Sequence, residues 1–174
     1  MAVKSILKMG DPTLLKKSET VQDFASNELA ILIEDLFETM AANQGAGLAA
    51  PQIGVLQNVV VFGIENNPRY PNAEDVPPTV LINPKIEVIG NSFQSYWEGC
   101  LSIPGMRGLV ERPDHIIYRG FDAKGNQLEI EATGFHAVVV QHECDHLDGV
   151  LYPMKMKGMS QFGFCEELDA AQST

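Results

Sequence analysis

Two histidines four positions apart, His142 and His146, offer the clearest chemistry in this sequence. On an α-helix they lie about 40° apart on one face, one turn above the other, which suits two ligands of one metal ion. Glu143 lies about 100° round from His142, too far to be the obvious third ligand but well placed to contact a water molecule on the metal. The stretch QHECDHLDG, residues 141–149, therefore predicts a metal site whose remaining ligand lies elsewhere.

The missing ligand does not follow the pattern of the common zinc peptidases, which add a Glu or His at a set distance downstream. After His146 the chain has no histidine and only four acidic residues, Asp148, Glu166, Glu167 and Asp169. Upstream, Cys100 in YWEGCLSIPG would complete a Cys/His2 set with an open fourth position, as in catalytic sites. Two plainer alternatives stay open: a helix with a polar exposed face, and Cys100 as a small buried apolar side chain.

The length and composition are typical of one globular domain. The 174 residues are 45% hydrophobic and 20% charged, and a chain of this size buries about 70% of its unfolded surface in one core. We therefore expect a single catalytic domain over residues 1–174. No apolar run approaches the roughly 20 residues that span a bilayer, and MAVKSILKMG lacks the apolar segment of an export signal. We expect a cytoplasmic protein that does not bind membranes.

The net charge bears on the partners of the protein, and the cysteine content bears on its compartment. The chain has 12 Lys and Arg against 23 Asp and Glu, a formal net charge of -11. Because binding to nucleic-acid phosphates needs a basic surface, we expect no direct sequence-specific nucleic-acid binding. The three cysteines, Cys100, Cys144 and Cys165, are an odd number without the spacing of a disulfide framework. They fit a reducing compartment and leave at least one thiol free to bind metal.

The first half of the chain predicts one helix and one buried strand. Residues 26–44, SNELAILIEDLFETMAANQ, carry apolar side chains at helical spacing, and Ser26 or Asn27 can cap the start. This is an N-terminal amphipathic helix. Residues 58–64 predict a buried strand, and the proline-rich residues 66–78 predict a loop.

The second half predicts several strands and then the helix that carries the histidines. Strands are expected within residues 79–90, 93–97 and 109–133, with DAKGNQ at 122–127 as a hairpin turn. GFHAVVVQHECDHLDG then predicts a second helix, ended by Gly149. The predicted class is α+β, with mixed or antiparallel strands packed around a central, C-terminal metal-binding helix.

Three segments in a fixed order make the sequence recognisable: GAGLAAPQ at 45–52, EGCLS at 98–102 and QHECDH at 141–146. Together with the opening ILKMGDPTLLKKSETV, residues 6–21, they resemble the peptide deformylase family over nearly the whole chain. Three such motifs at compatible spacing are specific. The resemblance implies a metal-dependent hydrolase that removes the formyl group from N-terminal formyl-methionine, giving formate and a free amine.

The resemblance also implies a role for each site residue. One divalent metal, Fe²⁺ in cells with Zn²⁺ or Ni²⁺ able to substitute, would be held by Cys100, His142 and His146. Glu143 would take the proton of the attacking water and hand it to the departing amine. The side chain of Gln52 and the backbone N–H of Leu101 would stabilise the tetrahedral oxyanion.

A peptide-binding groove is implied as well. The substrate would lie extended beside Gly45, Ala46 and Gly47, where small side chains let backbone pair with backbone. Ala46 departs from the larger aliphatic residue often found between these glycines, which predicts a methionine pocket that is roomier or filled from another side. The residues implied to line that pocket or contact the peptide are Phe135, Val138, Val139 and Arg107. The alternative is that the first three are ordinary core side chains and that Arg107 is an ordinary surface arginine, with no role in binding.

The implied partners are N-formylmethionyl nascent chains, with a transient contact to the ribosome. Many bacterial relatives end in a longer basic helix thought to help that docking. Here the tail MSQFGFCEELDAAQST, residues 159–174, is short and acidic. We therefore do not expect docking through a basic C-terminal helix.

Other functions explain part of the pattern. A thiol hydrolase with Cys100 as nucleophile would leave Glu143 and one histidine unused. A non-catalytic metal-binding module would not need Gln52 and Glu143. A general endopeptidase is the closest alternative in chemistry, and its substrates distinguish it from a deformylase.

Overall fold

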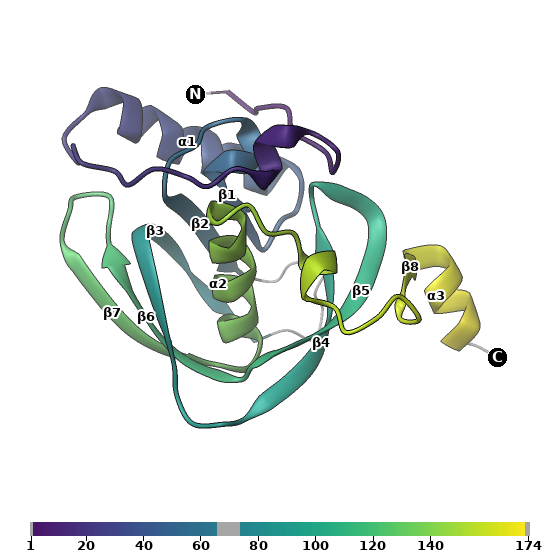
Figure 1. The fold of residues 1–174 in the computed structure, drawn as a ribbon. Helices are drawn as coiled ribbons and strands as arrows, with labels where there is room; N and C mark the ends of the chain where they lie inside the picture. Colours follow the sequence, from purple (N-terminus) through teal and green to yellow (C-terminus); the bar gives the residue numbers. More distant parts are fainter. Residues whose placement is uncertain (1, 66–73, 173–174) are drawn as a thin grey trace.

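The structure is a computed structural model that describes residues 2–65 and 74–172 (Figure 1). Its strands form two sheets. The five-stranded sheet has the order β1-β2-β3-β6-β7, with β1 at Gly47–Ala49, β2 at Val59–Ile64, β3 at Val76–Val88, β6 at His115–Phe121 and β7 at Gln127–Thr133. The three-stranded sheet has the order β4-β5-β8, with β4 at Phe93–Cys100, β5 at Ile103–Pro113 and β8 at Phe162–Phe164.

Helix α2, Gly134–Leu147, lies at the centre of the molecule between the two sheets (Figure 1). Val139 and Val140 of α2 pack into a core with the five-stranded sheet that includes Phe62 and Tyr118. The helix ends as predicted: Gly149 has a left-handed φ of 73°, and a Cβ there would lie 2.6 Å from the backbone of Leu15. The α+β class with a central C-terminal helix is therefore confirmed, and all named strand pairs are antiparallel.

Helix α1, Asn27–Ala42, is the predicted amphipathic helix. The Ser26 hydroxyl caps it by accepting a hydrogen bond from the Leu29 N–H at 3.2 Å. Its buried face packs with Leu48 of β1 and with Val59 and Val61 of β2. Helix α1 thus supports the segment that begins at Gly45, which lines the candidate site described below.

Two predicted boundaries were wrong. The expected loop over 66–78 lies partly outside the described residues, but Val76, Pro77 and Pro78 belong to β3. Prolines are tolerated there because, among the residues that the structure describes, this end of β3 pairs with β2 alone, and pairing with β6 begins at Ile82. The third predicted strand region, 109–133, begins at Ile103 rather than at Leu109.

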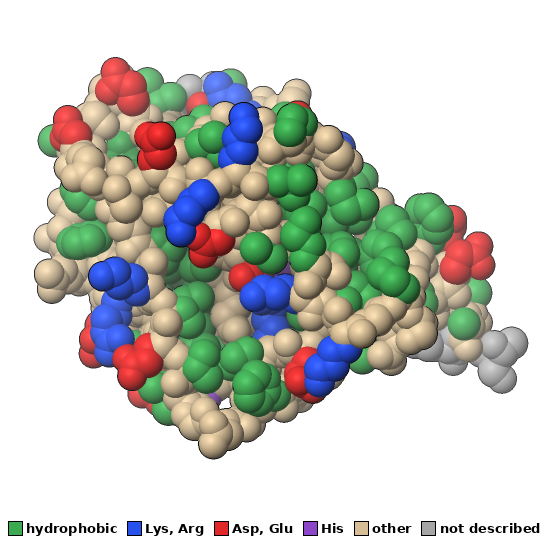
Figure 2. Space-filling view, viewed as in Figure 1, with side chains coloured by type: hydrophobic (Ala, Val, Ile, Leu, Met, Phe, Trp, Pro, Cys, Tyr) green, Lys and Arg blue, Asp and Glu red, His purple; other side chains and the backbone are tan. Residues whose placement is uncertain are grey.

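Several short elements were not predicted from the sequence, and some of them lie in the tail. The short 3₁₀ helices are η1 at Pro12–Leu15, η2 at Ala50–Ile53 and η3 at Tyr152–Lys155, and a third α-helix, α3, spans Cys165–Gln172. Strand β8 joins the tail to β5, where Gly108 pairs with Phe162. On the face in Figure 2, apolar side chains gather beside α3. Exposed apolar residues of the chain around η3 and β8 include Met154, Met159 and Phe164. None of the helices in residues 2–65 and 74–172 is long and apolar enough to cross a membrane.

Candidate active site

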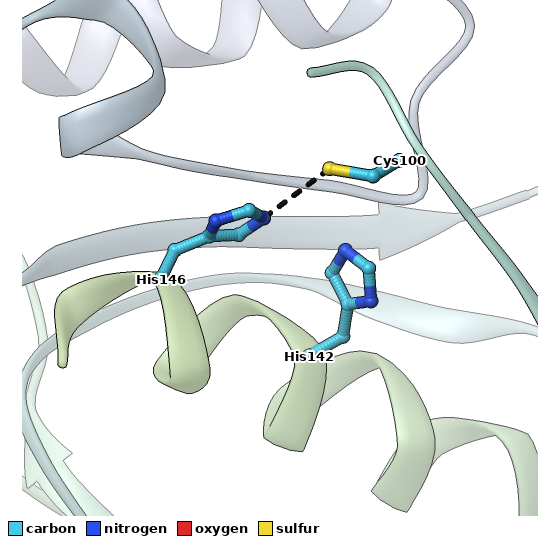
Figure 3. A group of neighbouring side chains, drawn as sticks. All are labelled: Cys100, His142 and His146. Carbon is cyan, nitrogen blue, oxygen red and sulfur yellow. Dashed lines mark hydrogen bonds between the residues drawn. The ribbon is translucent and has the colours of Figure 1, made fainter. Parts of the chain in front are cut away.

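The three predicted metal ligands come together from two elements. Cys100 ends strand β4, whereas His142 and His146 lie one turn apart on α2 (Figure 3). Their ligand atoms all lie within 4.8 Å of one another, and Cys100 Sγ lies 3.3 Å from His146 Nε2. One thiolate and two imidazoles at this separation form a donor set that fits a single divalent transition-metal ion.

A buried ion-pair network orients His142. Its Nδ1 lies 2.8 Å from Glu98 Oε2, which leaves Nε2 for a metal. Arg112 donates to both oxygens of the Glu98 carboxylate, from Nε at 2.5 Å and from Nη2 at 2.9 Å. Its Nη1 donates to Asp145 Oδ2 at 2.7 Å. Burial alone would raise the pKa of Glu98, but hydrogen bonds from Arg112 and His142 lower it to about 2.

This network was not predicted from the sequence, although one signal for it was present. Glu98 lies two residues before Cys100 on a strand, so both side chains point to the same face of the sheet. Arg112, however, lies on β5 and is brought to Glu98 by the pairing of β4 with β5. Its role depends on strand register, and no local pattern reveals it.

The environment of Cys100 favours a thiolate. Burial tends to raise the pKa of the thiol, but the positive charge and hydrogen bonds of His146 and His142 hold it well below its usual value. The thiolate is the form that binds metals. The backbone N–H of Ser102 and the side-chain amide of Gln52 also donate to Sγ, each at 3.4 Å.

Glu143 is buried beside the ligands with room on one side. Burial raises the pKa of its carboxyl to about 7, with the nearby histidines acting in the opposite direction. Its Oε2 has no hydrogen-bond partner among the described residues. Gly47 of β1 packs so closely that a Cβ there would lie 2.5 Å from Glu143 Oε1. This glycine is therefore needed to accommodate the carboxylate.

A pocket opens beside the ligands and collects most of the predicted substrate residues. Its lining includes Gly45, Ala46, Gly47, Gln52, Leu101, Phe135, Val138, Val139 and Glu143. Trp97 of β4 also lines it, although the sequence analysis did not select this residue. The pocket joins a largely apolar wall to Cys100, His142 and the Glu143 carboxylate. An apolar pocket with a few polar groups is the usual composition of a small-molecule or peptide site.

Arg107 is the one predicted substrate residue outside the pocket lining. Its guanidinium lies 5.3 Å from the centre of the ring of Trp97, which lines the pocket. Its Nη2 pairs with Asp169 of α3 at 2.5 Å. Arg107 therefore links α3 to a residue of the pocket wall.

The site combines a buried Cys/His2 donor set with a glutamate on the helix that carries both histidines. This combination is typical of a metal-dependent hydrolase. The polypeptide deformylase family model matches residues 3–162, and the chain belongs to the peptide deformylase family. Peptide deformylase 1 of Nitrosomonas europaea is 54% identical over 171 residues, 98% of this chain and 97% of that protein. Peptide deformylase 2 of Ralstonia nicotianae is 55% identical over 166 residues, 95% and 94% of the two chains.

Solved structures agree with the sequence comparison. The Met-Ala-Ser-bound peptide deformylase of Acinetobacter baumannii has a TM-score of 0.85 and 34% identity, covering 89% of this chain and 99% of that one. The peptide deformylase of Ehrlichia chaffeensis in complex with actinonin has a TM-score of 0.82 and 37% identity, covering 91% of each chain. The resemblance is confirmed: the chain is an enzyme, a metal-dependent hydrolase that removes the formyl group from N-terminal formyl-methionine.

Proposed function

We propose that residues 1–174 act as one catalytic domain in the cytoplasm, where the protein deformylates N-formylmethionyl nascent chains. The observation that carries this proposal is the donor set of Cys100, His142 and His146 beside the buried Glu143. Contacts of α2 with strands of both sheets support one domain. Three free cysteines fit a reducing compartment.

We propose that Fe²⁺ is the ion in cells, held by Cys100, His142 and His146. The donor set also fits Zn²⁺ and Ni²⁺, so the choice of iron rests on the family resemblance. When bound, the metal supplies Lewis-acid activation of the formyl carbonyl and of a water molecule. Glu98 fixes the ring of His142 through Nδ1, and Arg112 keeps Glu98 ionised.

Glu143 serves as the general base and then the general acid. Its carboxylate takes a proton from the attacking water and returns it to the nitrogen of the departing amine. Two features support this role: a buried Oε2 that has no hydrogen-bond partner among the described residues, and burial that raises the pKa of the carboxyl to about 7. A group with a pKa near the working pH can both accept and donate the proton.

Gln52 and the N–H of Leu101 donate hydrogen bonds to the oxyanion that forms as water attacks the formyl carbon. Gln52 Nε2 lies 3.4 Å from Cys100 Sγ, and both Gln52 and Leu101 line the pocket. Donors already in place before reaction need little rearrangement as the charge develops.

The substrate lies extended along β1. Strand β1 lies at the edge of the five-stranded sheet, and within the described residues its strand partner is β2. The peptide backbone runs past the segment from Gly45 to Gly47 on the side of β1 away from β2. The methionine side chain enters the apolar part of the pocket, next to Phe135, Val138 and Val139. The Acinetobacter baumannii enzyme binds Met-Ala-Ser, which supports a peptide as the ligand of this chain too.

Arg107 contacts the peptide beyond the methionine, and a brief contact with the ribosome brings the nascent chain to the pocket. Because α3 carries Glu166, Glu167 and Asp169, this ribosome contact does not use the C-terminal helix as a basic anchor.

Release of formate from formyl-Met-Ala-Ser by the metal-loaded protein tests the proposal directly. Acetyl-Met-Ala-Ser and unformylated casein are the matched controls, because an endopeptidase would cleave casein. We expect formate from the formyl peptide and little reaction with either control. Cleavage of casein at a comparable rate would contradict the proposed specificity.

A further inference from the structure

Ser102 is next to both groups proposed as oxyanion donors, because it follows Leu101 in the chain and contacts the side chain of Gln52. Its side chain is fully buried, and each of its polar groups has a partner. Its hydroxyl accepts a hydrogen bond from Gln52 Nε2 at 3.1 Å, and its backbone N–H donates to Cys100 Sγ at 3.4 Å. Its carbonyl oxygen accepts from the Met9 N–H at 2.8 Å. Ser102 thus contacts both Gln52 and the proposed metal ligand Cys100, but it is itself neither an oxyanion donor nor a metal ligand.

The side-chain amide of Gln52 is held at both ends. Its Oε1 accepts from the Ala49 N–H at 2.8 Å, which fixes which end of the amide carries the oxygen. Its Nε2 donates to Ser102 Oγ and to Cys100 Sγ. A glutamine has several rotatable bonds, so these contacts limit the directions in which its N–H groups can point.

The N-terminal segment fixes the backbones on which these two side chains stand. The Leu7 N–H donates to the Gln52 carbonyl and the Met9 N–H to the Ser102 carbonyl, both at 2.8 Å. Residues 7–9 therefore tie the two backbones together. With both backbones fixed, the direction of Gln52 Nε2 depends on its side-chain contacts, and the Ser102 hydroxyl at 3.1 Å is closer to it than Cys100 Sγ at 3.4 Å.

We propose that Ser102 is a positioning residue that aims the Gln52 amide at the reacting carbonyl. Its hydroxyl engages one N–H of Nε2, so that the other N–H faces Cys100 and the pocket. The inference rests on the proposed oxyanion role of Gln52. Loss of the hydroxyl would leave a buried donor without its acceptor and let the amide take other rotamers. The effect should appear in turnover, since Gln52 acts when the oxyanion forms.

A double-mutant cycle with Gln52→Leu tests the inference. We expect Ser102→Ala to lower kcat by about tenfold with KM within about twofold, because a buried neutral hydrogen bond is lost. In the Gln52→Leu background, the same change should cost less than about twofold, because the group it positions is gone. Metal content, measured by elemental analysis, should stay at the parent value in every variant.

Three outcomes would overturn the inference. A full tenfold loss from Ser102→Ala in the Gln52→Leu background would show that Ser102 acts through the fold or through Cys100. Loss of metal in Ser102→Ala would lead to the same conclusion. If Gln52→Leu by itself leaves turnover unchanged, the proposed role of Gln52 fails, and the inference fails with it.

Ser102→Thr keeps the hydroxyl and serves as the rescue variant. We expect its turnover to stay within about threefold of the parent, in contrast to the alanine variant. Should Ser102→Ala fail to fold, the threonine variant still decides the question. A folded, metal-loaded threonine variant with turnover as low as that of Gln52→Leu would contradict the inference.

Discussion

Replacing Arg112 with methionine should destabilise the whole fold, although Arg112 does not ligate the metal. Arg112 and Glu98 are 4% and 3% exposed in their side chains, and Arg112 donates to both carboxylate oxygens. Methionine fills similar space but leaves the Glu98 carboxylate buried, with only His142 beside it. Removing one partner of a buried ion pair typically costs about 3 to 5 kcal/mol.

That cost is a large share of the total stability, since a domain is typically stable by only about 5 to 15 kcal/mol. For a chain of this size, about 2 to 4 °C is lost per kcal/mol, so the melting temperature should fall by about 6 to 20 °C. Urea unfolding of the metal-free protein, followed by fluorescence, measures the free energy of unfolding. The single tryptophan, Trp97, is adjacent to Glu98 in the chain and reports on this region.

Arg119→Met is the matched control. Arg119 is 41% exposed and pairs with Glu87 and Glu129 on the surface. Exposed ion pairs contribute about 0 to 1 kcal/mol, so this variant should unfold almost like the parent. If the loss in Arg112→Met comes from an uncompensated charge, adding Glu98→Gln should recover part of it. A loss below about 1 kcal/mol in Arg112→Met would refute the reasoning.

Three further predictions concern the chemistry of the site. Glu143→Gln should bind metal normally but turn over formyl-Met-Ala-Ser about 10² to 10⁴-fold more slowly, because the amide cannot accept the proton; a rate within threefold of the parent would remove Glu143 from the mechanism. Cys100→Ser should retain less metal after dialysis, as elemental analysis would show, since an alcohol is a poorer anionic ligand than a thiol; full occupancy would contradict the ligand role. Protein loaded anaerobically with iron should turn over faster than the zinc form and lose activity in dilute peroxide, because peroxide can oxidise Fe²⁺ and, with it, the adjacent thiolate. The nickel form should survive because it lacks the ferrous ion; equal rates with zinc and iron would count against iron.

The sequence by itself was enough for the local features. The spacing of His142 and His146 places both rings on one face of any α-helix, because the helical repeat is fixed by the backbone. Gly149 was recognisable as the end of α2 because few other residues adopt its left-handed conformation. Cys100 could be proposed as a ligand from its chemistry and motif alone.

The tertiary structure decided the contacts that surround those residues. Glu98 is 14 residues from Arg112 and 44 from His142, and Gln52 is 50 residues from Ser102. Such pairs depend on the register of β4 against β5 and on where α2 packs, neither of which leaves a local pattern in the chain. A buried charge or amide is stable only with its partner in place, and the fold selects that partner from many polar residues of similar type.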